Sequence, residues 1–332
     1  MSQKANPVQA RMPLTEEDIA RLRAAIDDRL EHTFAHHEPD SRLVCAIRHG
    51  LLSPGKRLRP LITLLACHQC GGTIDDAMDA ACAVEMVHAA SLIMDDLPCM
   101  DNARLRRGAV TTHVVFGEGA AMLAAISLLN EAFRIISRCE ATPIHARLNA
   151  IARLSDAVGV DGLAGGQDQD LTCAGSAGHK VKPATGPNGS SCTQTSTGTT
   201  STVSLSDMEK RHMEKTGALF RAAAAIGGEF ANANDAVIEH LVDYGASLGL
   251  AYQAFDDVID VACTSDATGK DAAQDAEKST VVSLLGTDGA RILAERHLRN
   301  AIAHADGASV ISPAPLADLA RLIGKTFGSM TK

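Results

Sequence analysis

The sequence predicts an all-α fold, a single large helical bundle, and three observations support this. Apolar residues recur at helical spacing along nearly the whole chain, and Ala is abundant. Alternating β-branched stretches, the pattern of half-buried strands, are nearly absent. Several predicted helices, such as 120–136, are apolar on almost every side, which is typical of helices inside a large bundle. With 45% hydrophobic residues among 332, the chain can form a full core.

The helices are predicted in order from caps and apolar spacing. Thr15 is the candidate N-cap of the first, with Glu16, Glu17 and Asp18 in its first turn. Further helices are predicted at about 41–50, 58–69, 75–96, 118–138, 144–158, 207–230, 234–262, 273–285, 288–304 and 315–327. We expect one domain over 1–332, with a flexible N-terminus at 1–13. Residues 172–206 are rich in Ser, Thr, Gly and Pro, which predicts a low-complexity surface insertion.

Composition excludes several classes of function. Forty acidic against 31 basic residues, with 3% aromatics, argue against nucleic-acid binding, which needs a broad basic face and stacking rings. Residues 1–13 lack a signal-peptide core, and the longest apolar run, 120–129, is too short for a membrane span. The nine cysteines are scattered, and Cys67 and Cys70 have no second pair at zinc spacing, so we interpret them as free thiols. A cytoplasmic protein without a membrane span is expected.

Two acidic clusters stand out, each at the end of an apolar helix. The first is Asp95, Asp96 and Asp101, and the second is Asp256, Asp257 and Asp260. Asp256 and Asp260 are four residues apart and share a helix face. Asp101 would be turned away by a straight helix, but Pro98 disfavours helix and lets the chain bring Asp101 back. Carboxylates this close repel unless a cation neutralises them, and Mg²⁺ shares such oxygen ligands with substrate phosphates.

Basic residues occur where a phosphate site would need them. Gly55, Lys56, Arg57 and Arg59 lie in a short loop before a helix, and Arg104, Arg106 and Arg107 follow the first acidic cluster. Lys215, Lys270 and Lys278 come later in the chain. Since the overall charge is −9, an anionic substrate must meet such a local basic cluster or a metal ion. Acidic and basic groups together predict a cavity for two polyanions, one held through metal and one through Lys and Arg.

These residues resemble a known family, the trans-polyprenyl diphosphate synthases, in particular bacterial geranylgeranyl diphosphate synthases. The resemblance covers nearly the whole chain apart from the N-terminal segment and 172–206. Its strongest stretch is HAASLIM at 88–94 with the first acidic cluster, Asn102, LRRG at 105–108 and TTH at 111–113. GGQ at 165–167, KTG at 215–217 and Gln253 with the second acidic cluster complete an ordered, specific set. One departure is Pro54, where the family usually has a second glycine before the lysine.

The resemblance implies an isoprenoid synthase fold around a central active-site cavity, and a role for each matching residue. The six aspartates would hold three Mg²⁺ ions on the allylic diphosphate. Lys56, Arg59, His88 and Arg107 would bind isopentenyl diphosphate. Arg106, Lys215, Lys270 and Lys278 would bind the allylic diphosphate, and Thr216 and Gln253 would line the place where the allylic cation forms. Arg106, Lys215, Thr216 and Gln253 are thus the expected catalytic residues, with Gln167 and Asp170 supporting the site from behind. A homodimer is also implied by the family.

Product length is predicted from the helix before Asp95. Ala90 and Ser91 lie one turn back and are small, and Met86 and Val87 lie one turn deeper, where they could form the floor of the tail pocket. Related bacterial farnesyl synthases carry an aromatic residue at the Ala90 position. We therefore expect isopentenyl diphosphate to be condensed with C5 to C15 allylic diphosphates, with geranylgeranyl diphosphate (C20) as the main product. The alternative for Ala90 and Ser91 is simple helix-to-helix packing.

Four other functions remain alternatives. A farnesyl (C15) or longer-chain synthase would differ mainly in the tail pocket. A class I terpene synthase would cyclise its substrate, but the second acidic cluster and the Lys56–Arg59 loop argue against it. A non-catalytic partner subunit is disfavoured because both acidic clusters are intact. A di-iron carboxylate bundle would need paired Glu-x-x-His motifs, which the sequence lacks.

Overall fold

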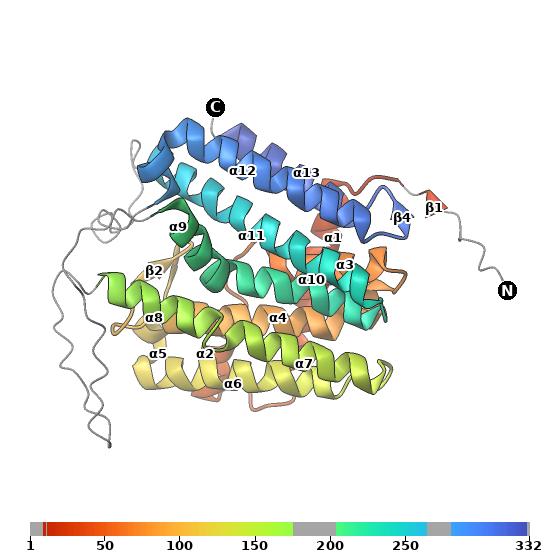
Figure 1. Cartoon of the computed structure of the whole chain (residues 1–332). Helices are drawn as coiled ribbons and strands as arrows, with labels where there is room; N and C mark the ends of the chain where they lie inside the picture. Colours follow the sequence, from red (N-terminus) through yellow and green to blue (C-terminus); the bar gives the residue numbers. More distant parts are fainter. Residues whose placement is uncertain (1–8, 11, 175–203, 264–279, 331–332) are drawn as a thin grey trace, which may run out of the picture.

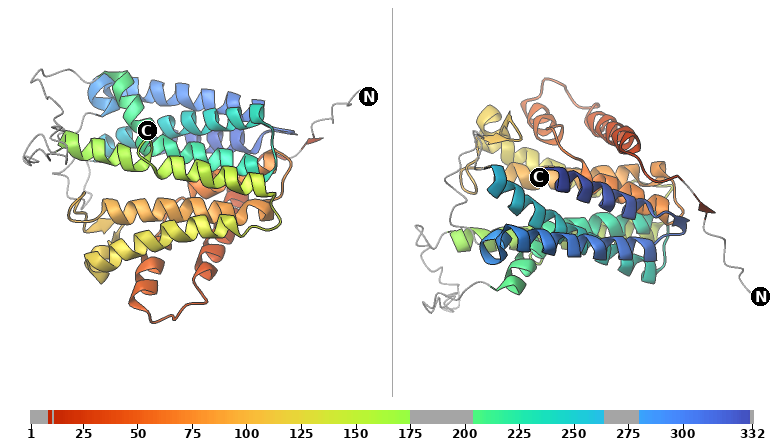
Figure 2. Two further views of the ribbon diagram at one scale, coloured as in Figure 1. Left: turned by 60° about the horizontal axis from the view of Figure 1, so that its bottom comes forward. Right: turned by 90° about the horizontal axis from the view of Figure 1, so that it is seen from above.

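The computed structural model describes residues 9–10, 12–174, 204–263 and 280–330, and it confirms the all-α prediction (Figure 1). Its α-helices are α1 Glu16–Thr33, α2 Arg42–Leu51, α3 Leu58–Gln69, α4 Ile74–Asp95, α5 Thr112–Phe116, α6 Glu118–Ser137, α7 Ile144–Val158, α8 Leu163–Ala174, α9 Leu205–His212, α10 Ala218–Phe230, α11 Asp235–Cys263, α12 Val281–Gly307 and α13 Pro315–Met330. A π-helical turn, η2 (Met213–Gly217), connects α9 to α10. The longer helices run side by side as a layered bundle (Figures 1 and 2).

Most predicted helices are present within a few residues, and the differences have local causes. The sequence prediction missed α5, which is very short, and α8, because Gly165 and Gly166 lower its apparent helix propensity. The predicted boundary of the insertion at 172–206 is wrong at its ends, since α8 continues to Ala174 and α9 starts at Leu205. The predicted break between 285 and 288 falls at Gly286, whose φ of 70° interrupts α12. Most of the predicted helix at 273–285 lies outside the described residues.

Four of the described helices begin with a reciprocal cap, and the first of them is at Thr15, the predicted N-cap. The Thr15 hydroxyl accepts from the Asp18 backbone N–H, and the Asp18 carboxylate accepts from the Thr15 N–H. Thr73 does the same at α4, Ser204 at α9 and Thr280 at α12. Each such cap stabilises its helix by about 1 kcal/mol. The caps of α4 and α12 fix the helices that lead to and follow the two acidic clusters.

Helix α4 forms the centre of the core. Its middle, Ala80 to Val84, is fully buried, and the helix packs against α3, α6 and α10. The small side chains let neighbouring helices approach closely. By length and composition alone α4 and α6 could cross a membrane, but 67% of the apolar window of α4 and 50% of that of α6 are buried inside the protein. Such burial is what core helices of a bundle show.

The β-structure is limited to two small pairs among the described residues. Strand β1 (Gln9–Ala10) pairs in parallel with β4 (Ile311–Ser312). Gln9 and Ala10 lie within the segment predicted as a flexible N-terminus over 1–13, and their backbone is paired; the flexibility of that segment stays a prediction. Strands β2 (Leu105–Arg106) and β3 (Ala109–Val110) form an antiparallel hairpin. This hairpin follows directly after the first acidic cluster.

The cysteines confirm the interpretation as thiols. Burial raises the pKa of both Cys67 and Cys70 to about 12, so neither is a reactive thiolate. The six cysteines whose side chains the structure describes are unpaired.

Candidate active site

The C-terminal ends of α4, α8 and α11 lie at the same end of the bundle (the left end in Figure 1). Helix α4 stops at Asp95, and the chain then folds back on itself through a series of turns. The Asp101 backbone N–H donates to the Asp95 carbonyl at 2.9 Å, and the Met100 N–H donates to Leu97 at the same distance. The prediction that Asp101 returns toward Asp95 is confirmed. Three carboxylates thus cluster at the end of a buried helix.

The charges in this first cluster are partly balanced by basic side chains. The pKa of Asp95 is raised to about 6, chiefly by burial and also by the negative charges of Asp101 and Asp96, against the opposing effect of Lys215 and Arg106. Asp96 is only 5% exposed and accepts a hydrogen bond from Arg106 Nε at 2.7 Å. Burial also raises the pKa of Asp96, against the opposing effect of Arg106. Asp95 is therefore the carboxylate with the most to gain from a cation.

The second cluster lies near the end of α11, whose helix runs unbroken through Asp256, Asp257 and Asp260. The Asp257 side chain accepts from Gln253 Nε2 at 3.1 Å and from the Val281 backbone N–H at 2.8 Å. Asp256 is half-buried, while the side chain of Asp260 lies outside the described residues. Asp257 thus ties α11 to the first turn of α12.

The π-helical turn η2 positions two further predicted residues. Lys215 Nζ lies 2.6 Å from Asp170 Oδ2 on α8, and the Thr216 hydroxyl donates to Gln253 Oε1 at 3.1 Å. A π-turn displaces one residue from the regular helix, which re-aims the side chains around it. Gly166 on α8 allows the close approach, because a Cβ there would lie 2.8 Å from the Lys215 backbone nitrogen. The ion pair places Asp170 beside Lys215, and the supporting role of Asp170 stays a prediction.

Gln167 connects α8 to the first cluster. Its side-chain amide approaches the Met100 sulfur at 4.0 Å, and its carbonyl oxygen is buried without a hydrogen-bond partner. The structure therefore places Gln167 beside the turn that carries Asp101.

The basic loop lies across from these elements. Lys56 is exposed, and its ammonium lies over the rings of Tyr252 and Phe327, at 5.4 and 5.0 Å from their centres. The Arg59 guanidinium lies 4.6 Å from the centre of the Phe220 ring. Arg59 Nη1 donates to His88 Nε2 at 3.2 Å. Because an arginine can only donate, Nε2 accepts and the His88 proton lies on Nδ1.

His88 itself is a neutral imidazole in this surrounding. Its pKa lies well below the usual value, first because it is buried and then because Arg59 and Arg107 are positive. A neutral ring with one N–H can donate to a phosphate oxygen, and it has little tendency to take up a proton.

The hairpin of β2 and β3 carries the remaining basic residues. Arg107 (φ 53°) and Gly108 (φ 77°) are its two turn residues, and positive φ at both is the geometry of a tight type I′ hairpin. Arg107 Nη1 donates to the Pro54 carbonyl at 3.1 Å, which connects the hairpin to the basic loop. This contact uses the backbone carbonyl of residue 54, which a glycine at this position would also offer.

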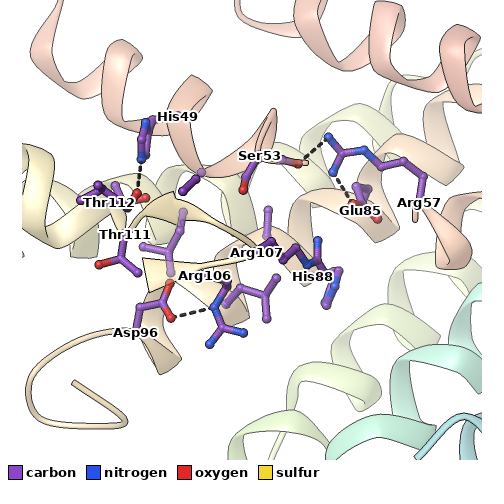
Figure 3. A pocket seen from close by; sticks show the side chains of 16 residues that line it. His49, Ser53, Arg57, Glu85, His88, Asp96, Arg106, Arg107, Thr111 and Thr112 are labelled. Atoms are coloured by element: carbon purple, nitrogen blue, oxygen red, sulfur yellow. Dashed lines mark hydrogen bonds and ion pairs between the residues drawn. The ribbon is translucent and has the colours of Figure 1, made fainter. Parts of the chain in front are cut away.

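A small pocket lies where α2, α4 and the hairpin meet (Figure 3). Its lining includes His49, Glu85, His88, Asp96 and Arg107. Its volume of about 30 Å³ suffices for a water molecule and not for a diphosphate. It marks a polar space behind the basic residues.

The predicted chain-length residues lie inside α4. Met86, Val87 and Ala90 are fully buried, while Ser91 is half-buried and donates to the His88 carbonyl at 2.9 Å. Their role in product length stays a prediction. Lys270 and Lys278, predicted to bind the allylic diphosphate, lie outside the described residues.

The sequence does not reveal Glu85, the buried partner of Arg57 in the basic loop. Arg57 is one of a run of loop charges, and Glu85 lies within an apolar helix 28 residues away. Their contact depends on how α3 and α4 pack. The one available signal was a charged residue at a core position of α4.

Among the described residues, no three His, Cys, Asp or Glu side chains form a ready-made metal cage. This is compatible with Mg²⁺, which is usually held by one or two carboxylates, with water and substrate phosphate completing the octahedron.

Comparison with known proteins decides the family. The family profile described as polyprenyl synthetase matches residues 41–309. The chain belongs to this family. Among its polyprenyl synthetase relatives, the geranylgeranyl diphosphate synthase of Pantoea ananas is 38% identical over 89% of each chain. The geranylfarnesyl diphosphate synthase of Leucosceptrum canum is 37% identical over 90% of this chain and 77% of its own. A solved FPP/GFPP synthase from Zymomonas mobilis superposes with a TM-score of 0.74 at 31% identity, covering 93% of this chain and 98% of that one.

Proposed function

We propose that this polyprenyl synthetase is a geranylgeranyl diphosphate synthase, which condenses isopentenyl diphosphate with C5 to C15 allylic diphosphates. The observation that carries the proposal is the ordered set of two acidic clusters and their basic neighbours at one end of the bundle. The relative from Pantoea ananas, named for this product, supports it. The family match over 41–309 also supports a single synthase domain over 1–332.

The acidic clusters suit Mg²⁺, which the family generally uses. Asp95, Asp101 and Asp256 would hold it, because they offer hard oxygen ligands and Asp95 is crowded by like charges. Asp96, Asp257 and Asp260 belong to the same proposed set, with three ions per site as the family resemblance implies. When bound, Mg²⁺ supplies positive charge that stabilises the departing diphosphate.

Two separate sets of residues in the protein would bind the two substrates. Lys215 and Arg106 would bind the allylic diphosphate next to Asp95, and their charge favours ionisation of its C–O bond. Lys270 and Lys278 are proposed to help them. Thr216 and Gln253 present oxygen atoms that stabilise the allylic cation. No protein nucleophile is required.

The second substrate would be bound on the opposite side of the site. Lys56, Arg59 and Arg107 supply charge for isopentenyl diphosphate, and His88 donates Nδ1–H to one of its oxygens. Holding the isopentenyl double bond close to the cation makes the attack effectively intramolecular. The proton lost afterwards goes to the released diphosphate, because His88 is kept neutral and bonded to Arg59.

A second copy of this chain is the proposed partner. Val115, Met122, Leu123 and Ile126 on α5 and α6, with Leu148 on α7, are large apolar side chains exposed between 48 and 59%. Large apolar side chains exposed on neighbouring helices are the kind of surface that an oligomer interface covers. The homodimer can be tested by sedimentation, with Leu123→Glu expected to yield monomers.

The decisive experiment is a product-length assay with purified protein, Mg²⁺, labelled isopentenyl diphosphate and each of the C5, C10 and C15 allylic diphosphates. Mainly C20 product that is abolished by a chelator supports the proposal. The solved FPP/GFPP synthase makes C15 or C25 the alternative. No condensation with any primer would overturn the proposed chemistry.

The same assay tests the tail pocket. Ala90→Phe should shorten the main product to C15, because the ring would obstruct the path along α4. A variant that folds and still makes C20 would show that other residues form the floor of the tail pocket.

A further inference from the structure

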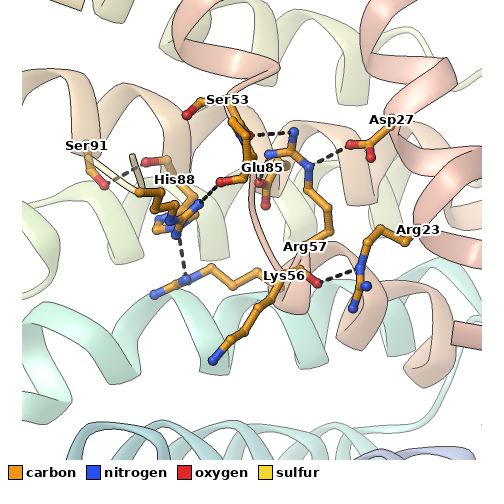
Figure 4. A network of polar contacts seen from close by, with 11 residues as sticks. Arg23, Asp27, Ser53, Lys56, Arg57, Glu85, His88 and Ser91 are labelled. Atoms are coloured by element: carbon orange, nitrogen blue, oxygen red, sulfur yellow. Dashed lines mark hydrogen bonds and ion pairs between the residues drawn. The ribbon is translucent and has the colours of Figure 1, made fainter. Parts of the chain in front are cut away.

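The basic loop is held from behind by a buried ion pair that the proposed chemistry does not use (Figure 4). Arg57 Nη1 donates to Glu85 Oε1 at 2.7 Å, with both side chains at most 5% exposed. The same guanidinium donates to Asp27 on α1 at 2.7 Å and to the Ser53 carbonyl at 3.0 Å. One arginine thus joins α1, α4 and the loop that carries Lys56.

Arg57 adopts a backbone conformation that side-chain contacts must maintain. Its φ of 47° and ψ of 38° are left-handed, which is unfavourable for a residue with a Cβ. The residue is also the N-cap of α3, so its conformation sets the direction in which the chain enters that helix. Lys56 precedes it directly, and Arg59 is two residues further on. The position of both predicted substrate-binding residues therefore depends on Arg57.

Glu85 has a second, unused oxygen in the same place. Its Oε2 is buried without a hydrogen-bond partner, and so is Arg59 Nε. Glu85 lines the pocket together with His88 and Arg107. The charges of Arg57, Arg59 and Arg107 all stabilise its carboxylate against the cost of burial. A single buried negative charge thus faces three arginines from the loop, α3 and the hairpin.

We propose that Glu85 is a positioning residue for the isopentenyl diphosphate site. Through Arg57 it fixes the loop that presents Lys56, and its charge keeps Arg59 and Arg107 close together before a diphosphate arrives. The inference rests on the proposed function. It assigns Glu85 to one of the two substrates only, because its ion pair reaches the loop of Lys56, whereas Lys215 of the proposed allylic site lies on η2 and Asp95 lies at the far end of α4.

The test is Glu85→Gln, which retains the shape and removes the charge. We expect KM for isopentenyl diphosphate to rise about tenfold, as for the loss of one charge-assisted hydrogen bond, with kcat and the allylic KM changed less than about threefold. The matched control is Glu229→Gln, which removes the charge of another buried glutamate, paired at 2.8 Å with Arg153, whose side chain is 33% exposed. It should lower Tm, though less than Glu85→Gln because water can solvate Arg153, and leave both KM values unchanged.

Asp27→Asn is a second variant that avoids a failure to fold, since Asp27 is 47% exposed in its pair with Arg57. It should raise the isopentenyl KM about two- to threefold, as for a half-exposed charged contact. An unchanged isopentenyl KM in a folded Glu85→Gln, or equal rises in both KM values, would overturn the inference. Should Glu85→Gln not fold, an unchanged KM in Asp27→Asn would overturn it. Wild-type protein that fails to condense any primer would instead refute the proposed function.

Discussion

The two acidic clusters share a layout and differ in what holds them. In each, the second aspartate is buried and bonded to the protein, while the first is half-buried. Asp96 is bonded to the charged Arg106 of the hairpin, whereas Asp257 is bonded to the neutral Gln253 and to a backbone N–H of α12. The first cluster therefore has basic side chains around it, and the second is built into the helical framework. One carboxylate of each pair supports the structure, and its neighbour is the proposed cation ligand.

The largest effect on activity should come from replacing the first aspartate of each cluster. Asp95→Asn and Asp256→Asn should each lower kcat about 10³-fold or more, because each removes an anionic ligand from transition-state charge stabilisation. Steady-state kinetics at saturating Mg²⁺ measures this. If one variant retained most of the wild-type rate, the two clusters would not be equivalent in metal binding.

Gly166→Ala tests the contact between α8 and η2. A Cβ there would lie 2.8 Å from the Lys215 backbone nitrogen, so we expect a loss of about 1–3 kcal/mol in unfolding free energy, as for overpacking. Gly119→Ala in α6 is the control, since a Cβ there meets nothing within 4 Å. It should stabilise the protein by about 0.5–1 kcal/mol. Chemical denaturation measures the change in unfolding free energy for both variants. If Gly166→Ala stabilised the protein as Gly119→Ala does, α8 would be able to shift away from η2.

Replacing the buried aspartate should lower the stability of the protein more in the second cluster, at Asp257, than in the first, at Asp96. Asp257→Asn replaces the charged acceptor at the start of α12 with a neutral one. We expect the free energy of unfolding to fall by about 1–2 kcal/mol. Asp96→Asn should cost less, because Arg106 is 30% exposed and can be solvated by water. Thermal unfolding of the metal-free variants measures the difference. The reverse order would show that the hairpin contributes more to stability than the α11–α12 junction.

The smallest effect is a dependence on pH. The pKa of Asp95 is raised from 3.8 to about 6, so its contribution to stability is full below pH 4 and is lost as pH rises through 6. At pH 7.5 the ionised carboxylate of Asp95 lowers the stability of the fold, and a bound cation would offset this loss. Mg²⁺ with inorganic diphosphate should therefore raise Tm more at pH 7.5 than at pH 5.5.

The control for this dependence is Asp95→Asn, which cannot titrate at this position and should flatten the difference. Equal rises of Tm at both pH values in wild type would contradict the assignment of Asp95 as a cation ligand.

The sequence was most informative where a single local signal decides the structure. Thr15 and Asp18 predicted a cap, Pro98 predicted the return of Asp101, and Gly286 falls where a helix break was expected. It was least informative where the decisive contact joins distant segments. Nothing local marks Arg57 as left-handed or pairs it with Glu85. Gly165 and Gly166 concealed α8 because each allows a close approach, Gly165 to the Val160 backbone and Gly166 to η2.

The scarcity of aromatic rings has a practical consequence for spectroscopy. The chain contains no Trp and two Tyr. Tyr244 is fully buried and donates to the Leu316 carbonyl, so it gives a constant background. The ring of Tyr252 lies beneath the Lys56 ammonium, next to Phe327. A phosphate that draws Lys56 away changes the surroundings of one of only two ultraviolet fluorophores of this kind, so the unlabelled protein carries its own optical reporter of loop movement.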